Sequence, residues 1–219
     1  MNTDLAPLHR SPAFHRLPPP EGVQWWVPEG IRITEYLDYC MEQVSVDGLW
    51  LEFGVYLGRT IRYMARRHPG PLYGFDSFEG LPEAWEGGPR GDWPKGYFDL
   101  GGRVPRLPES NVTLVKGWFH QTLPGFLREH PGPVALLHID CDLYRSTQQV
   151  LDALVSRLVP GSIILFDEFY NYPGFTEHEF RAFSELVERH GIEFRYLAHV
   201  ADDIRAAVRI EANPAAAVP

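Results

Sequence analysis

Residues 49–60 read L-W-L-E-F-G-V-Y-L-G-R-T, and this stretch predicts a buried strand that turns directly into a helix. The apolar run that ends at Phe53 is the strand, Gly54 ends it, and a helix is expected over residues 60–68. A glycine at such a turn lets the backbone approach a ligand closely, because no side chain stands in the way. Residues 72–76 are the next apolar run and predict a second strand.

The same alternation continues along the chain. Further strands are expected over residues 111–116, 133–140, 162–167, 192–198 and 206–210, and helices over 121–130, 146–158 (closed by Pro160 and Gly161) and 177–190. Strands that alternate with helices predict a mainly parallel sheet, and right-handed crossovers favour a doubly wound arrangement. We therefore expect one α/β Rossmann-like domain with a mostly parallel seven-stranded sheet and helices on both faces.

Length and composition bound the remaining possibilities. The 219 residues suffice for one α/β domain, which we place at residues 31–210 between an irregular arm, 1–30, and a tail, 211–219. A net charge of −9 argues against nucleic acid and against anionic lipid as partners. No stretch approaches the roughly 18 apolar residues of a membrane helix, and no signal peptide is recognisable. We expect a cytoplasmic protein.

Two aromatic segments predict covering elements. The long segment 77–110 carries Trp85, Trp93, Tyr97 and Phe98, which argues against disorder, so we expect a substrate lid that could hold a short helix. In the arm, the adjacent residues Trp25 and Trp26 need cover from the body or from a second chain. This need predicts a homodimer or a higher oligomer.

Ligands of doubly wound folds lie beyond the carboxyl ends of the strands, so the first turn is a candidate cofactor site. Gly54 and Gly58 bracket this turn, but Tyr56 replaces the middle glycine that lets a backbone approach a pyrophosphate. The acidic Glu52 just before the turn suits a cation better than an anion. S-adenosylmethionine, with its ammonium and sulfonium groups, fits such a pocket, although a plain strand-to-helix turn is the alternative.

The ends of the second and third strands extend this candidate site. Asp76 lies where nucleoside-binding sheets contact the ribose hydroxyls, although a helix cap or turn residue is the alternative. Trp118 follows the third strand and could stack on adenine or pack in the core. The predicted cofactor-binding residues are Glu52, Gly54, Val55, Tyr56, Gly58, Asp76, Ser77, Gly117, Trp118 and Phe119.

Acidic side chains gather at the ends of the fourth and fifth strands, in L-L-H-I-D-C-D-L-Y and I-I-L-F-D-E-F-Y. Adjacent strands would bring Asp140 and Asp167 side by side, where carboxylates repel one another unless a cation compensates. Hard oxygen ligands select Mg²⁺ or Ca²⁺, and Mg²⁺ is favoured because it needs few protein carboxylates beside water. Solvated strand-end acids that cap helices are the alternative. Asp142 shares the face of Asp140 if the strand persists, or else faces the turn. His138 could act in proton transfer near Asp140 or be a buried, hydrogen-bonded residue.

Together these motifs resemble the macrocin O-methyltransferase family, whose members methylate sugar hydroxyls of macrolide and aminocoumarin antibiotics. The resemblance spans residues 48–190 and rests on L-E-F-G-V-Y-L-G, G-F-D-S-F-E-G-L-P, H-I-D-C-D-L-Y-R-S-T and P-G-S-I-I-L-F-D-E-F. It implies a class I methyltransferase that uses S-adenosylmethionine and Mg²⁺. The implied acceptor is a small molecule, a sugar hydroxyl of a secondary metabolite or a glycan precursor.

The resemblance also implies roles for individual residues. Asp140 corresponds to a metal ligand that is also the general base, and Asp167 and Glu168 correspond to an acidic pair that completes the metal site. The family usually has two aspartates there, so Glu168 is a departure. His138 is the second candidate catalytic residue. The alternatives are a catechol-type O-methyltransferase acting on a small aromatic and a non-catalytic nucleoside-binding protein of the same fold.

Overall fold

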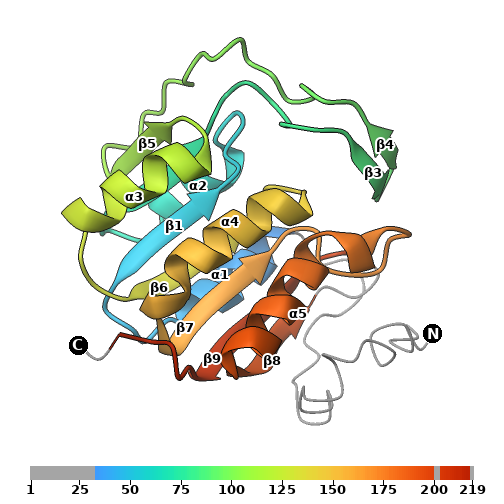
Figure 1. Ribbon diagram of the computed structural model, residues 1–219. Helices are drawn as coiled ribbons and strands as arrows, with labels where there is room; N and C mark the ends of the chain where they lie inside the picture. Colours follow the sequence, from blue (N-terminus) through green and yellow to red (C-terminus); the bar gives the residue numbers. More distant parts are fainter. Residues whose placement is uncertain (1–32, 200–202, 218–219) are drawn as a thin grey trace.

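Seven strands form one sheet in the order β5-β2-β1-β6-β7-β9-β8 in the computed structural model, which describes residues 33–199 and 203–217 (Figure 1). The strands are β1 (Leu49–Phe53), β2 (Leu72–Asp76), β5 (Val112–Lys116), β6 (Val134–Ile139), β7 (Leu158–Phe166), β8 (Glu193–His199) and β9 (Ala206–Ala212). The first five are parallel, and β9 runs antiparallel to both β7 and β8. The predicted doubly wound, mostly parallel seven-stranded fold is confirmed.

The strand order reverses between β1 and β6, since the chain builds outward from β1 through β2 to β5 and then returns to add β6 and β7. Ligands of such sheets bind beyond the carboxyl ends of the strands at this switch point. In the register, Phe53 pairs with Ile139, and Ile139 pairs with Phe166. The residues that follow these three therefore reach the same edge of the sheet together.

Helices cover both faces of the sheet (Figure 1). One face packs against α1 (Ile33–Glu42) and α2 (Arg59–Ala65), and the other against α3 (Phe119–Glu129), α4 (Tyr144–Leu154) and α5 (Glu179–His190). Because both faces are covered, every residue of β6, V-A-L-L-H-I, is buried. Burial of one valine, leucine or isoleucine side chain in this run stabilises the fold by roughly 1.5–3 kcal/mol. The histidine is the one polar side chain buried in the same run.

The expected helix over residues 146–158 is too long. It ends at Leu154, a short 3₁₀ turn (Val155–Arg157) follows, and Pro160 and Gly161 lie inside β7. The pairing of β6 with β7 shifts register between Val134 and Leu136, which marks an irregularity opposite this Pro-Gly pair. Proline and glycine are tolerated in strands at such irregularities. The Pro-Gly pair therefore belongs to β7 and does not mark the end of the helix.

The expected tail is also partly wrong. Strand β9 continues to Ala212, and the side-chain amide of Asn213 donates to the carbonyls of Val155 and Leu158 at 2.8 and 2.7 Å. The amide of Ala217 donates to the carbonyl of Ser156 at 2.7 Å. These bonds dock residues 213–217 on the turn between α4 and β7, so this part of the expected tail packs against the domain.

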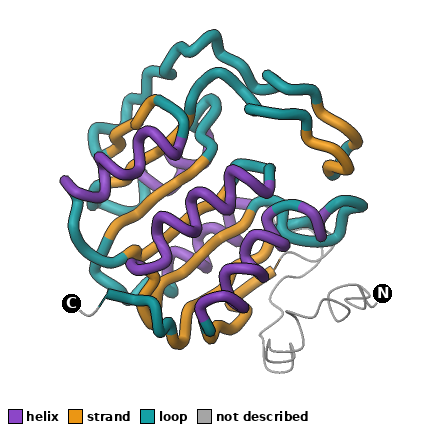
Figure 2. The backbone as a smooth tube through the Cα atoms, viewed as in Figure 1, coloured by secondary structure: helices purple, strands orange, loops and turns teal. Residues whose placement is uncertain are grey.

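The segment 77–110 contains a hairpin and no helix. Its strands are β3 (Trp85–Gly88) and β4 (Gly91–Trp93), and long loops carry it beyond the sheet edge (Figure 2). The amide of Gly174 donates to the carbonyl of Gly87 at 2.9 Å, and Nε2 of His178 contacts the carbonyl of Glu86 at 2.8 Å. The hairpin is thus tied to the chain just before α5.

Within the described ranges, no helix has the length and apolar character needed to cross a membrane. Trp25, Trp26 and the rest of the arm 1–30 lie outside the described residues. The oligomer inferred from those tryptophans therefore stays a prediction.

Candidate functional site

A cavity of about 1170 Å³ lies at the carboxyl ends of β1, β6 and β7. Most of the predicted site residues line it: Gly54, Val55, Tyr56, Asp76, Ser77, Trp118, Phe119, Asp140, Asp167 and Glu168. Glu52, Gly58, Gly117 and His138 are not among the lining residues. The sequence therefore predicted most of the residues around the cavity, but it did not distinguish the residues that line the cavity from those that lie behind the lining.

The glycine turn after β1 is explained by the chain's own backbone. A Cβ atom at Gly54 would lie 1.6 Å from the carbonyl oxygen of Asp140, and Gly54 has a φ of +89°. Only glycine fits this position. The close approach that we expected toward a ligand is thus an approach toward Asp140, and it fixes the end of β1 against the end of β6.

Asp76 at the end of β2 holds the same turn from the other side. One of its carboxylate oxygens accepts hydrogen bonds from the amides of Val55 and Tyr56 at 2.9 and 2.7 Å, and the other accepts from the amide of Phe78 at 2.7 Å. An ionised carboxylate has about four acceptor sites, so these bonds leave capacity for a ligand hydroxyl. Asp76 therefore links the turn, the start of segment 77–110 and the cavity.

The aromatic pair after β5 occupies the start of α3. Phe119 packs edge-on against Phe53, with ring centroids 5.2 Å apart, and Trp118 precedes the helix in extended conformation. Both side chains line the cavity. Phe119 thus serves the core and the cavity wall at once, whereas Trp118 lines the cavity with no ring contact to another described residue.

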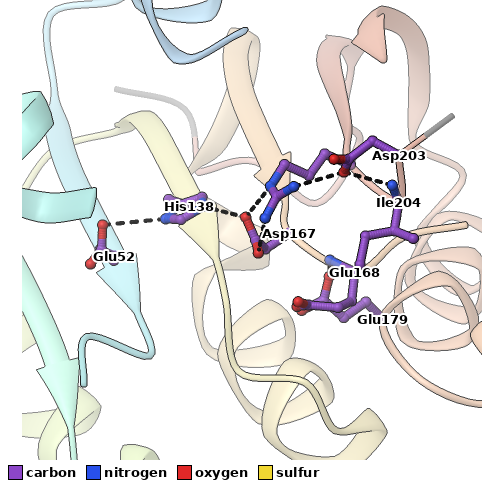
Figure 3. Close-up of polar contacts among 8 residues, drawn as sticks. Glu52, His138, Asp167, Glu168, Glu179, Asp203 and Ile204 are labelled. Carbon is purple, nitrogen blue, oxygen red and sulfur yellow. Dashed lines mark hydrogen bonds and ion pairs between the residues drawn. The ribbon is translucent and has the colours of Figure 1, made fainter. Parts of the chain in front are cut away.

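Glu52 and His138 form a buried pair beneath the cavity (Figure 3). They are register partners in β1 and β6, each is 1% exposed, and Nδ1 of His138 lies 3.2 Å from Oε2 of Glu52. Burial lowers the pKa of His138, but its hydrogen bonds to Asp167 and Glu52 prevail and raise it to about 10. His138 is therefore protonated at neutral pH, and Glu52 is its counter-charge.

Asp167 is held by an arginine that the sequence analysis missed. Nε and Nη2 of Arg205 contact the two carboxylate oxygens of Asp167 at 2.6 and 2.9 Å, and Nη1 contacts Asp203 at 2.7 Å. Nε2 of His138 lies 3.8 Å from Asp167 on the other side. Burial raises the pKa of Asp167, but the His138 hydrogen bond and the Arg205 charge together hold it below its usual range.

These contacts arrange charges of alternating sign across the sheet edge (Figure 3). Acidic and basic side chains alternate along this row, in the order Glu52, His138, Asp167, Arg205 and Asp203. Asp167 is thus fully compensated. Arg205 lies at the start of β9, far from the other site residues in sequence, and no motif in residues 203–205 signalled its role.

A second set of acids lacks basic partners at ion-pair distance in the described chain, although a ring nitrogen of His138 lies within 4.8 Å of a carboxylate oxygen of Asp140. Carboxylate oxygens of Asp140, Asp142 and Glu168 lie within 4.8 Å of one another, and in the described chain none of the three pairs with a basic side chain. Burial, reinforced by the charge of Asp167, raises the pKa of Asp140 and of Glu168 well above their usual values and that of Asp142 to about 8. Oε2 of Glu168 is buried and has no hydrogen-bond partner among the residues that the structure describes.

Two members of this acidic region were not placed by the sequence. Asp142 has a φ of +62°, a left-handed turn conformation, yet its carboxylate lines the cavity beside Asp140. Glu179, at the start of α5, is 0% exposed and accepts a hydrogen bond from the amide of Glu168 at 3.2 Å. Crowded, buried carboxylates with orphaned oxygens are the donor set of a hard divalent cation, so the residues present fit Mg²⁺.

Comparison with known proteins agrees with this geometry. A family model described as a methyltransferase domain matches residues 51–169. This range contains the glycine turn, Asp76 and both groups of strand-end acids.

Curated relatives act on antibiotics. An 8-demethyl-8-(2,3-dimethoxy-alpha-L-rhamnosyl)-tetracenomycin-C 4'-O-methyltransferase of Streptomyces olivaceus is 31% identical, and the match covers 64% of this chain but only 61% of that protein. A demethyldecarbamoylnovobiocin O-methyltransferase of Streptomyces niveus is 27% identical over 73% of this chain and 69% of its own length.

Among solved structures, the calicheamicin methyltransferase CalS11 superposes with a TM-score of 0.63 at 26% identity, covering 81% of this chain and 78% of its own. Its apo structure carries the name TDP-rhamnose 3'-O-methyltransferase.

Proposed function

The chain belongs to the family of methyltransferase domains, and from that premise we propose that it transfers the methyl group of S-adenosylmethionine to a sugar hydroxyl with the help of a divalent cation. The observation that carries this proposal is the crowded, buried acidic group Asp140, Asp142 and Glu168 at the switch-point cavity. The antibiotic sugar O-methyltransferases among its relatives support the same reaction.

The methyl donor is expected beside the glycine turn. Asp76 has acceptor capacity left for the ribose hydroxyls, and Trp118 offers a face for adenine. Glu52 is not expected to touch the donor, because it is buried against His138.

Asp140, Asp142 and Glu168 are the residues that would hold the cation. Asp167, which the family resemblance includes among the ligands, lies within 4.8 Å of Asp140 and His138, and its two contacts with Arg205 leave acceptor sites with which it could join them. A bound Mg²⁺ supplies a Lewis acid that lowers the pKa of a hydroxyl and fixes its direction. We infer that His138 acts through Asp167, since it has no place on the cavity wall.

The transfer itself needs one base and close alignment. Asp140 accepts the proton of the acceptor hydroxyl as the general base. The hydroxyl oxygen forms a bond to the methyl carbon while the bond between that carbon and sulfur breaks, which leaves S-adenosylhomocysteine. The enclosing cavity contributes by holding oxygen, carbon and sulfur in line.

The proposal is tested by incubating the protein with S-adenosylmethionine and sugar acceptors, TDP-rhamnose and a rhamnosylated tetracenomycin among them. We expect a product that is heavier by one methyl group, and we expect EDTA to slow its formation by about 100-fold or more until Mg²⁺ is restored. Equal rates with and without EDTA would exclude the cation. Methylation of a catechol, with no sugar accepted, would support the catechol-type alternative instead.

We also propose that segment 77–110 is a lid over the acceptor. Its Trp93 lines the cavity and contacts Tyr97 and Phe98, with ring centroids 4.1 and 5.8 Å apart. Trp93→Ala, and in a second variant deletion of residues 85–97, should raise the acceptor KM by about tenfold or more, because an aromatic wall is lost. The dissociation constant of S-adenosylmethionine, measured by calorimetry, should stay unchanged. Unaltered acceptor kinetics in both variants would refute the lid.

A further inference from the structure

Three basic side chains line the cavity and have no partner among the described residues. Arg90 is at the tip of the β3–β4 hairpin, Lys95 follows β4, and Arg145 lies in the first turn of α4. All three are exposed, and across the described ranges no hydrogen bond or ion pair of their side chains is found. In a chain with a net charge of −9, such a grouping of free cations calls for an anionic ligand.

Several other basic side chains of the described residues are engaged. Arg62 and Arg66 both contact Glu109, and Arg157 donates to three backbone carbonyls. Within the cavity, Arg205 is held by Asp167. Arg59 also lines the cavity, but it directly follows the glycine turn and so belongs to the side where the methyl donor is expected. This leaves the three cations of the hairpin and α4 for the acceptor.

The acids on the same wall do not neutralise these cations. Glu79 and Glu83 line the cavity as well, but neither forms an ion pair with a basic side chain in the described part of the chain. The hairpin is fixed by its bonds to Gly174 and His178, so Arg90 is carried by an anchored element.

The start of α4 adds donors at the same place. Ser146 is 8% exposed and lines the cavity, and its hydroxyl has no hydrogen-bond partner among the described residues. Leu143 caps the helix without a side-chain bond, so the first amides of this 11-residue helix, including that of Arg145, are unsatisfied. A buried free hydroxyl, free helix amides and an adjacent guanidinium together form a phosphate-binding arrangement.

We propose that the acceptor sugar is linked to a nucleoside diphosphate, whose phosphates bind Arg90, Lys95, Arg145 and Ser146 while the sugar reaches the acids at the floor. This inference rests on the proposed function and narrows its acceptor to a nucleotide sugar. Single small ligands fill cavities of roughly 300–1,000 Å³. The cavity of about 1170 Å³ therefore has room for a methyl donor together with part of a second ligand.

Calorimetry with TDP tests this without relying on turnover. TDP is titrated into protein saturated with S-adenosylhomocysteine, in EDTA so that phosphate cannot bind through a metal. We expect saturable binding that weakens with added salt, and we expect Arg145→Gln and Lys95→Gln each to weaken it by about tenfold, as loss of one charge-assisted contact implies. Arg90→Gln should act in the same direction.

Arg128→Gln is the matched control, because Arg128 is equally exposed and unpaired but lies in α3 away from the cavity. Affinity for S-adenosylhomocysteine should be the same in all four variants, which also verifies folding. Absence of TDP binding, or equal loss in the control, overturns the proposal. If a neutral glycoside is methylated while TDP does not bind, the methyltransferase function stands and the nucleotide sugar alone is wrong.

Discussion

Asp140→Asn is expected to lower kcat for methyl transfer by about 1,000-fold while leaving the affinity for S-adenosylmethionine within about twofold. A positioned base contributes roughly 10²–10⁴ to a rate, and asparagine can neither accept the hydroxyl proton nor supply an anionic oxygen to a cation. Asparagine has the shape of aspartate, so the close packing of Asp140 against Gly54 should persist. The change therefore removes chemistry and keeps the architecture.

The measurement is single-turnover methylation of a competent acceptor, with calorimetry of S-adenosylmethionine binding on the same samples. Asp152→Asn is a suitable control, because Asp152 forms a surface ion pair with Arg189 at 2.7 Å and lies outside the cavity. That control should retain the wild-type rate, since surface ion pairs contribute little. An Asp140→Asn rate within tenfold of wild type would mean that another residue is the base.

Asp142→Asn distinguishes two roles for Asp142, that of a cation ligand and that of the general base. Asp142 lies within 4.8 Å of Asp140 and Glu168, so it should weaken cation binding if it is a ligand. A variant with normal cation affinity but a much reduced rate would instead give Asp142 the role of the base. The first outcome supports the proposed ligand role, and the second reassigns the base while leaving the proposed reaction in place.

The sequence predicted the fold well because its signals are local. Apolar runs such as residues 134–139, with Pro-Gly or glycine breaks between most elements, are enough to recover the strands and their parallel connections. The acids at the strand ends follow from the same logic, since the carboxyl ends of parallel strands share one edge. That reasoning placed Asp140, Asp167 and Asp76 at the cavity correctly.

What the sequence could not predict depends on contacts between distant segments. The pairing of Glu52 with His138 requires the register of β1 against β6, and the capture of Asp167 by Arg205 requires β9 to insert beside β7. Gly54 is a glycine because of the backbone of Asp140, not because of a ligand. Pro160 misled the helix boundary, because a local breaker signal cannot distinguish the end of a helix from an irregular strand.

The last prediction concerns stability. Without a cation, the free energy of unfolding should fall by about 3 kcal/mol or more between pH 7 and pH 9, at about 1.4 kcal/mol per pH unit for each group that keeps an extra proton in the folded state. Burial and the charge of Asp167 raise the pKa of Asp142 to about 8. For His138, burial lowers the pKa, but hydrogen bonds to Asp167 and Glu52 outweigh it and raise the pKa to about 10.

The sign follows from these directions. A group with a raised pKa in the folded state contributes stability that is complete below its unfolded pKa and is lost as the pH rises through its folded pKa. Asp167 has a lowered pKa, so its contribution is constant above about pH 4. Burial lowers the pKa of His199 to about 4. Its contribution to stability therefore rises with pH up to about pH 6.5 and is constant above that pH. Between pH 7 and pH 9 only the falling contributions remain.

Urea unfolding followed by circular dichroism, in EDTA and in excess Mg²⁺, gives the required profiles. Mg²⁺ should stabilise the protein more at pH 9 than at pH 7, because a cation binds carboxylates that have already released their protons. Asp142→Asn should flatten the EDTA profile, since it removes one titrating carboxyl and leaves His138 in place. A profile in EDTA that is flat or rises over this range would show that the acids are solvated, and the case for a cation at Asp140, Asp142 and Glu168 would then lose its electrostatic basis.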